Sequence, residues 1–459
     1  MFKHLAVFLS LFAVLGCNSP KDDSIYFGGK IINPKSDHVI LYAMEKAIDT
    51  FFLDDENKFI GKVTPVKEGL YYFNHGVENQ YIYLEPNDSL MLRLNTWDFD
   101  ESLGFSGRGA DRNNILIDCF LENEKNHKAF YKLNRLKPND FKKKIDSILE
   151  FKTNTYERYL KEHPNETSGF HNILNIALKY PIYSRIERYP IAHSKYSETK
   201  HEQNLGSDFY NHRKGISMDT DSLMYYPAYA QYIRNYLYNL TYALGYEPMN
   251  NEYSSAFTED LLKIIDKNIS PKKSKNAFLK QTVITHFYRK SSCEINKGAF
   301  DTYFDLSSDQ DDIDLVRKML IDNNAILKGK KLLDFNLYDY TSAKHNIQEI
   351  IKRKNTFLFF WNPEYVSPMY IASRMNYFSN KFPEIQFIQV RIDGKNTKKI
   401  HKLDIKNQYY IDAKSEANNF LSSKMPRSII INKNGIVENG YASISSSKVV
   451  RQLKELTNK

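Results

Sequence analysis

Three patterns of apolar and polar residues follow one another along the chain. Up to about residue 105, short runs alternate apolar and polar residues at every second position, which is typical of half-buried strands. Examples of strand-like runs lie over residues 26–32, 38–42, 69–73, 81–84 and 90–94, and several of them show this alternation. Short strands at this even spacing predict a small antiparallel β-sandwich over residues 25–108.

The second pattern covers residues 109–327, where apolar residues recur at i, i+3 and i+4 and predict helices. The clearest helices are expected over residues 114–124, 140–159, 224–244, 256–269, 275–288 and 313–326. In contrast, residues 180–219 show no strong core pattern and are rich in Tyr, Ser, His and Asn. We interpret this stretch as a long loop, and as the best candidate for a partner contact or a mobile cover.

The third pattern, over residues 328–459, mixes strands and helices. Residues 356–361 form a continuous apolar run whose length and aromatic content favour a strand covered on both faces. A loop with Pro363 and Pro368 follows, and residues 369–382 then have the spacing of an amphipathic helix. A helix that starts directly after a buried strand favours anions and thiolates, because its first N–H groups lack partners.

This order of elements resembles the thioredoxin-like domain of the TlpA-like thiol:disulfide oxidoreductases. In that family the apolar strand ends in Phe-Trp, as it does here at Phe360 and Trp361, and a Cys-x-x-Cys motif follows. The corresponding loop of this chain holds other residues, namely Tyr365, Val366, Ser367, Pro368 and Met369. Dithiol exchange needs an attacking thiolate and a resolving thiol, and this loop supplies neither.

A second feature of the family is a cis-proline that is followed by a strand and a turn. Residues 425–437 have this form, so the resemblance implies that Pro426 is the cis residue. In the family the residue before this proline pairs with the backbone of a bound peptide, and here that residue would be Met425. Arg427 would place a cation beside the same groove.

Together these features predict an α+β protein with three domains: a β-sandwich-like domain (25–108), a helical domain (109–327) and a thioredoxin-like α/β domain (328–459). For the degenerate loop two possibilities stay open. It is either a redox-inactive surface that binds an extended peptide or an envelope protein, or a scaffold kept for packing. We favour a redox-inactive accessory or binding module.

An enzymatic alternative is a TlpA-like oxidoreductase that uses an atypical cysteine. Cys119 lies on an apolar helical face, where buried free cysteine is common, and Cys293 lies in a polar loop. We therefore expect two unpaired thiols.

The start of the chain predicts its location. A basic residue precedes an apolar stretch of about eleven residues, which is too short for a membrane span and typical of a signal peptide. The stretch ends in Val14-Leu15-Gly16-Cys17, which resembles a bacterial lipobox and implies removal of residues 1–16 and lipidation of Cys17. Residues 17–24 would be a tether to outer-membrane lipid, on the periplasmic face or at the cell surface. Their lysine and aspartates resemble the export tag of surface lipoproteins in Bacteroidota.

Composition excludes some partners. Of the 459 residues 42% are hydrophobic, which is enough for sizeable cores, and the net charge is +9. No basic stripe is interleaved with aromatic residues, so we expect no nucleic-acid binding. His193 and His201, near Glu198 and Glu202, match no compact ligand spacing. We expect no metal and no cofactor, because the sequence also lacks a phosphate loop, a nucleophile elbow and a metalloprotease helix.

Overall fold

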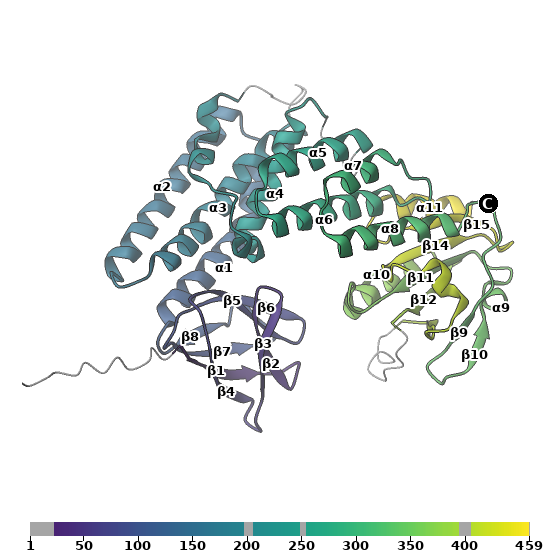
Figure 1. Ribbon diagram of the computed structural model, residues 1–459, viewed down its shortest axis with the longest axis horizontal. Coiled ribbons are helices and arrows are strands. Elements are labelled where there is room, and N and C mark those ends of the chain that lie inside the picture. Colours follow the sequence, from purple (N-terminus) through teal and green to yellow (C-terminus); the bar gives the residue numbers. More distant parts are fainter. Residues whose placement is uncertain (1–22, 197–204, 248–253, 394–404, 459) are drawn as a thin grey trace, which may run out of the picture. The chain divides into compact units, whose positions relative to one another are not determined.

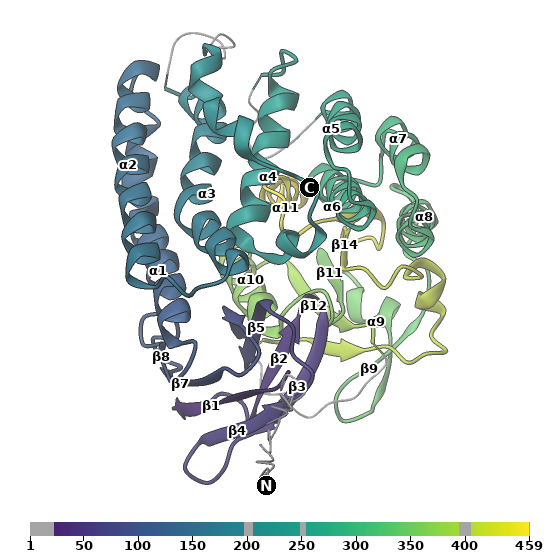
Figure 2. The ribbon, with the colours of Figure 1, turned by 60° about the vertical axis from the view of Figure 1, so that its left-hand side comes forward.

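The computed structural model describes residues 23–196, 205–247, 254–393 and 405–458 (Figures 1 and 2). Contacts divide the chain into two compact units. The first unit runs to Arg185 and also includes Ser222–Tyr232, and the second consists of Ile186–Asp221 and Ile233–Lys459. The division into three domains stays a prediction, because contacts group the first helices with the N-terminal strands.

The first unit begins with two four-stranded sheets around a shared apolar core, drawn in purple and blue in Figure 1. The strand orders are β4-β1-β7-β8 and β3-β2-β5-β6. The strands are β1 (Ile25–Ile32), β2 (His38–Ala43), β3 (Lys46–Phe52), β4 (Lys58–Val63), β5 (Gly69–His75), β6 (Glu78–Leu84), β7 (Ser89–Asn95) and β8 (Gly104–Ser106).

The sandwich is not purely antiparallel as predicted, because β1 and β7 pair in parallel. Strands that follow one another in sequence tend to form antiparallel hairpins, but most strands between β1 and β7 belong to the other sheet. Strands β3, β4 and β8 were not predicted. Strand β3 exposes Lys46, Ala47, Ile48, Thr50 and Phe52, so its apolar residues do not alternate cleanly between the two faces.

Two consecutive asparagines at the start of the first helix join it to both sheets. The Asn113 amide accepts the N–H of Tyr83 at 2.7 Å and donates to the carbonyl of Tyr83 at 3.0 Å. Asn114 makes the same pair of bonds with Phe105, at 2.9 and 3.1 Å. Because Tyr83 lies on edge strand β6 and Phe105 on edge strand β8, the helix satisfies backbone groups that sheet edges leave open.

Three long helices follow the strands, and Figure 2 shows them beside one another: α1 (Ala110–Leu133), α2 (Pro138–Glu162) and α3 (Ser168–His193). The predicted long loop over residues 180–219 is therefore wrong for its first part, which is helical. Helix α3 is buried on several sides and so lacks the single apolar stripe that reveals a surface helix. His193, at its end, is buried and stacks on Tyr189. Glu198, His201 and Glu202 lie outside the described residues.

The remaining helical elements are η1 (Ser207–Gly215), η2 (Asp221–Tyr225), α4 (Pro227–Tyr242), α5 (Ser255–Asn268), α6 (Lys272–Lys290), α7 (Gly298–Leu306) and α8 (Gln310–Ala325). Helices α4, α5, α6 and α8 agree in position with the predicted ones. Helix α7 was missed because it is too short to show a clear period. Within the described part of the chain, no helix is both long and apolar enough to cross a bilayer.

The second unit also holds a seven-stranded sheet with the order β10-β9-β13-β12-β11-β14-β15. Its strands are β9 (Asn336–Tyr338), β10 (Lys344–Asn346), β11 (Thr356–Trp361), β12 (Gln386–Arg391), β13 (Gln408–Tyr410), β14 (Arg427–Ile431) and β15 (Val437–Ala442). Strand β11 is buried along its whole length, pairs in parallel with β12 and pairs antiparallel with β14.

Helices cover both faces of this sheet. On one face, α10 (Pro368–Lys381) and α11 (Lys448–Thr457) pack against β11, and on the other lie α9 (Ile347–Ile351) and η4 (Glu416–Phe420). The predicted strand with two covered faces is therefore confirmed. The order of buried strand, loop and helix, and the strand and turn after Pro426, also agree with the prediction.

Candidate functional site

The loop after β11 is held by Asn362, a buried residue that no sequence motif marks. Its side-chain oxygen accepts the N–H of Glu364 at 3.1 Å. Its carbonyl accepts the N–H groups of Tyr365 and Val366 at 3.0 and 3.1 Å. An asparagine that follows a strand commonly forms such a turn, and this one fixes the backbone before α10.

Helix α10 begins at the position where the resembling family has its cysteines. The Ser367 hydroxyl accepts the N–H of Tyr370 at 3.2 Å, and Pro368 is the first helical residue. Serine suits this cap because its hydroxyl satisfies an N–H group, and proline suits the next position because it has no N–H to satisfy. Ser367 and Pro368, which stand in this loop, therefore start the helix.

Pro426 lies beside this loop, but the Met425–Pro426 bond is trans. Among the described residues a cis bond occurs only at Thr64–Pro65, so the predicted cis conformation is wrong. The trans form of such a bond is favoured by about 0.5–1 kcal/mol. Here it is held from both sides, because the Met425 N–H donates to Ser423 Oγ at 3.3 Å and the Pro426 carbonyl accepts the Tyr288 hydroxyl at 2.8 Å.

Arg427 does not present a cation to the groove as predicted. Its side chain is buried and donates to the carbonyls of Asp322 at 2.8 Å, Phe420 at 2.6 Å and Gly440. Burial lowers the pKa of this guanidinium. Along β14 the side chains alternate between the faces of the sheet, so Arg427 and the next residue point to opposite faces.

A cavity of about 230 Å³ lies where the loop, Pro426 and helix α6 meet. Its described lining residues are Tyr288, Phe359, Tyr365, Val366, Tyr370, Met425, Pro426, Arg427, Ser428, Ala442, Ser443, Ile444 and Ser445. Ser428 is fully buried and pairs with Phe359 across the strands, and its hydroxyl has no hydrogen-bond partner among the described residues. Because buried hydroxyls are normally satisfied, this one marks a position where a ligand group can bind.

Two tyrosines form the rim of this cavity. Tyr365 is 44% exposed and Tyr370 is 41% exposed, although each lines the cavity. The Tyr370 hydroxyl lies 3.5 Å from Ser445 Oγ on the opposite side. Met369 is exposed but does not line the cavity, and Trp361 is buried in the core under α10 and α11.

The side chains that line the cavity are mostly apolar residues, tyrosines and serines. Its described lining contains no aspartate, glutamate, histidine or cysteine. Arg427 is already committed to three carbonyls. Burial raises the pKa of Tyr288 well above its ordinary value, so its hydroxyl stays protonated and continues to donate to Pro426. Tyr288 could not be found from sequence, because it is far from the loop along the chain.

Both cysteines in the described part of the chain are unpaired, which confirms the prediction. Cys119 is buried in α1, and burial raises the pKa of its thiol to about 12. Cys293 is half-buried and lines a separate polar cavity of about 190 Å³. The two thiols belong to different units.

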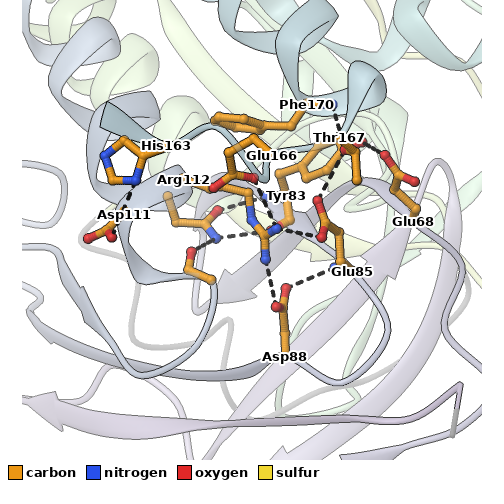
Figure 3. Close-up of polar contacts among 12 residues, drawn as sticks. Glu68, Tyr83, Glu85, Asp88, Asp111, Arg112, His163, Glu166, Thr167 and Phe170 are labelled. Carbon is orange, nitrogen blue, oxygen red and sulfur yellow. Dashed lines mark hydrogen bonds and ion pairs between the residues drawn. The ribbon is translucent and has the colours of Figure 1, made fainter. Parts of the chain in front are cut away.

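A second polar cluster, drawn in Figure 3, lies in the first unit and was not foreseen from the sequence. Arg112 of α1 contacts Asp88 at 2.6 Å, Glu85 at 2.6 Å and Glu166 at 3.2 Å. All four side chains are largely buried. Gly109 has a φ of 94°, and a Cβ there would lie 2.9 Å from Asp88 Oδ2, so only glycine fits beside the cluster.

The cluster in Figure 3 links a β-turn, the start of α1 and the connection between α2 and α3. It is best explained as a structural joint, because its only cation is satisfied by carboxylates. No group of three or more His, Cys, Asp or Glu side chains in the described ranges is placed to hold a metal ion.

Comparisons with known proteins find likeness of structure only. No protein-family model and no curated protein matches the chain. A protein from Bacteroides vulgatus described as a thiol-disulfide oxidoreductase is 20% identical, with a TM-score of 0.25, over 28% of this chain and 97% of that one. A thiol:disulfide interchange protein from Bacteroides sp. is 15% identical, with a TM-score of 0.23, over 29% of this chain and 93% of that one.

A thiol peroxidase from Chromobacterium violaceum is 10% identical, with a TM-score of 0.23, over 29% of this chain and 87% of that one. The structural neighbours are thus mostly thiol-disulfide oxidoreductases of the kind that the sequence resembles. The likeness covers little more than a quarter of the chain and says nothing about its chemistry.

Proposed function

We propose that this chain is a lipid-anchored envelope protein whose thioredoxin-like module binds a partner without redox chemistry. The cavity beside Pro426 carries the proposal, because it combines an apolar wall, two exposed tyrosines and an unpartnered hydroxyl. At about 230 Å³ it is smaller than the roughly 300–1,000 Å³ of usual small-molecule sites. It matches a single large side chain of a protein or peptide.

Recognition through a side chain also follows from the backbone at Pro426. A peptide that adds to a sheet edge needs free N–H and C=O groups there. The Met425 N–H and the Pro426 carbonyl are both engaged within the chain. The partner is therefore expected to insert an apolar side chain that ends in a polar group, and to bond that group to Ser428.

A peptide-binding experiment tests this role. A displayed library of eight-residue peptides is selected on the chain from Asn18 onward, and dissociation constants are measured for the enriched peptides. Tyr365→Ala combined with Tyr370→Ala is expected to weaken binding at least tenfold, because exposed aromatic anchors dominate such interfaces. Tyr377→Ala is the control, since Tyr377 is 45% exposed and lies on the same helix as Tyr370 but does not line the cavity. Equal losses in both variants, or no enriched peptide, would refute the proposal.

Lipid anchoring and placement at the outer membrane rest on the lipobox-like sequence and the polar tether. Cys17 lies outside the described residues. Metabolic labelling with an alkyne fatty acid tests the anchor: the full chain is expected to incorporate the label, and Cys17→Ser to lose it. If the wild-type chain does not incorporate the label, the proposed lipid anchor is refuted.

The alternative function is thiol:disulfide exchange through an atypical cysteine. The observation in its favour is that Cys293 is half-buried and lines a cavity. Disulfide reduction is measured with insulin as substrate and dithiothreitol as the electron donor, for the wild type, Cys119→Ser and Cys293→Ser. We expect no turnover in any of them, and turnover that Cys293→Ser abolishes would establish the alternative.

A further inference from the structure

The outer face of sheet β4-β1-β7-β8 carries three cations in one row across its strands. The register places Lys30 of β1 directly opposite Lys58 of β4 and directly opposite Arg93 of β7. All three side chains are exposed, while their strand neighbours point into the core. Like charges directly opposite one another destabilise a sheet, so the fold itself does not explain this row.

Carboxylates neutralise little of this charge. In the described part of the chain Lys58 pairs with Glu56, which lies in the turn before β4. Glu56 also attracts Lys30, and Asp54 acts on Lys58, so two carboxylates face three cations, and no described carboxylate forms an ion pair with Arg93. The row therefore keeps an excess of positive charge.

Apolar side chains lie beside the cations on the same face. The next row places Ile60 opposite Gly28, which in turn lies opposite Met91. Ile60 is 68% exposed. Because Gly28 has no side chain, no neighbour on β1 covers the side chain of Ile60. In the row after that, Lys62 lies opposite Tyr26, with its Nζ 6.0 Å from the ring centroid. Exposed apolar residues bordered by cations are typical of surfaces that lie on anionic membranes.

We propose that this face lies on an anionic phospholipid surface. The inference rests on the proposed lipid anchor for its geometry, because strand β1 follows Cys17 after a short tether. Even fully extended, that tether spans at most about 30 Å, so the anchor would hold the sandwich close to the bilayer. The charge of the face is complementary to anionic headgroups and not to neutral ones.

The expected effect of the charged row is large enough to measure. A basic residue near an anionic leaflet contributes roughly fivefold to binding, so three contribute roughly 100-fold. Partition of the chain from Asn18 onward is measured by co-sedimentation with vesicles of phosphatidylcholine, with and without phosphatidylglycerol. The test variant is Lys30→Gln with Lys58→Gln and Arg93→Gln. It is expected to lose roughly 100-fold in partition to the anionic vesicles, and to be no less stable than the wild type.

The matched control carries the same change of charge on helix α2. Lys143, Lys144 and Arg158 are exposed there, and their combined replacement by glutamine is expected to change partition less than fivefold. Equal losses in the two triple variants would mean that only net charge matters and would overturn the inference. Equal partition of the wild type to neutral and anionic vesicles would overturn it as well.

A second measurement reports contact directly. Ile60→Trp places a fluorophore on the face, and quenching by brominated phosphatidylglycerol is expected, whereas Lys144→Trp is expected to stay unquenched. A duplex DNA of matched charge is the third probe, and tighter binding to it than to the vesicles would reassign the face and overturn the inference. All of these measurements use unlipidated protein. Their outcome is therefore independent of the outcome of the Cys17 labelling experiment, so failure of the membrane-surface inference and failure of the lipid anchor can be told apart.

Discussion

Removing the cation of the cluster in Figure 3 should destabilise the first unit strongly. Arg112→Met keeps the length and apolar stem of the side chain but leaves Glu85, Asp88 and Glu166 facing one another without a cation. Breaking a buried ion pair by removing one partner costs about 3–5 kcal/mol, because the remaining charge stays buried. Glu85 and Glu166 keep slight solvent access, so the lower half of that range is expected.

The loss should depend on pH. Burial raises the pKa of Asp88 from 3.8 to about 6, against the opposing effects of the Glu85 N–H and Arg112. The folded state therefore holds a proton that the unfolded chain releases between pH 4 and 6. In the wild type the free energy of unfolding of this unit falls as the pH rises through that window, by up to about 3 kcal/mol. Arg112 lowers the pKa of Asp88, so without Arg112 this carboxyl should hold its proton more strongly, and the loss should be larger at pH 7 than at pH 4.

Pulsed hydrogen exchange along a urea series, read by mass spectrometry, measures this for each unit separately. Peptides from residues 25–106 report on the first unit, and peptides from residues 356–442 are an internal control. Arg108→Met is the matched variant, because Arg108 is exposed one turn earlier, and it should change stability by less than about 0.5 kcal/mol. A loss below about 1 kcal/mol for Arg112→Met at pH 7, or a loss independent of pH, would refute this account of the cluster.

Three further predictions concern single residues. Cys293 should react with a thiol reagent much faster than Cys119 in the folded protein, because burial raises the pKa of Cys119 to about 12; similar native rates would contradict this. Burial lowers the pKa of His286 to about 4, so the free energy of unfolding of the second unit should fall by up to about 3 kcal/mol as the pH drops from 6.5 to 4. His286→Gln should reduce the dependence of the free energy of unfolding on pH. An unchanged dependence would mean that other titratable groups cause it. The buried carboxylate of Asp322 accepts four hydrogen bonds from Ser422 and Ser423. Asp322→Ala should therefore lower the urea midpoint of the second unit by the equivalent of about 3 kcal/mol. A change under about 1 kcal/mol would contradict this, because it would mean that other groups replace the lost hydrogen bonds.

The sequence by itself determined most of the secondary structure of the last third of the chain. The apolar run at 356–361, the prolines after it and the helical period that follows are local signals, and each reflects the conformation that its own residues prefer. The absence of cysteine from Tyr365 to Met369 was equally plain. Helix α3 was not predicted, because a helix that is buried on several sides shows no regular alternation of an apolar and a polar face in its sequence.

Only the tertiary structure decided which residues form the cavity beside Pro426 and the ion-pair cluster around Arg112. Tyr288 reaches Pro426 from a helix far away in sequence, and Arg112 meets three carboxylates from two other segments. The burial of Arg427 and the cation row at Lys30 follow from strand register, which local propensity does not specify. Side chains distant along the chain acquire roles only when packing brings them together. The site residues that could be named from sequence therefore lie in two short continuous segments, 361–369 and 425–427.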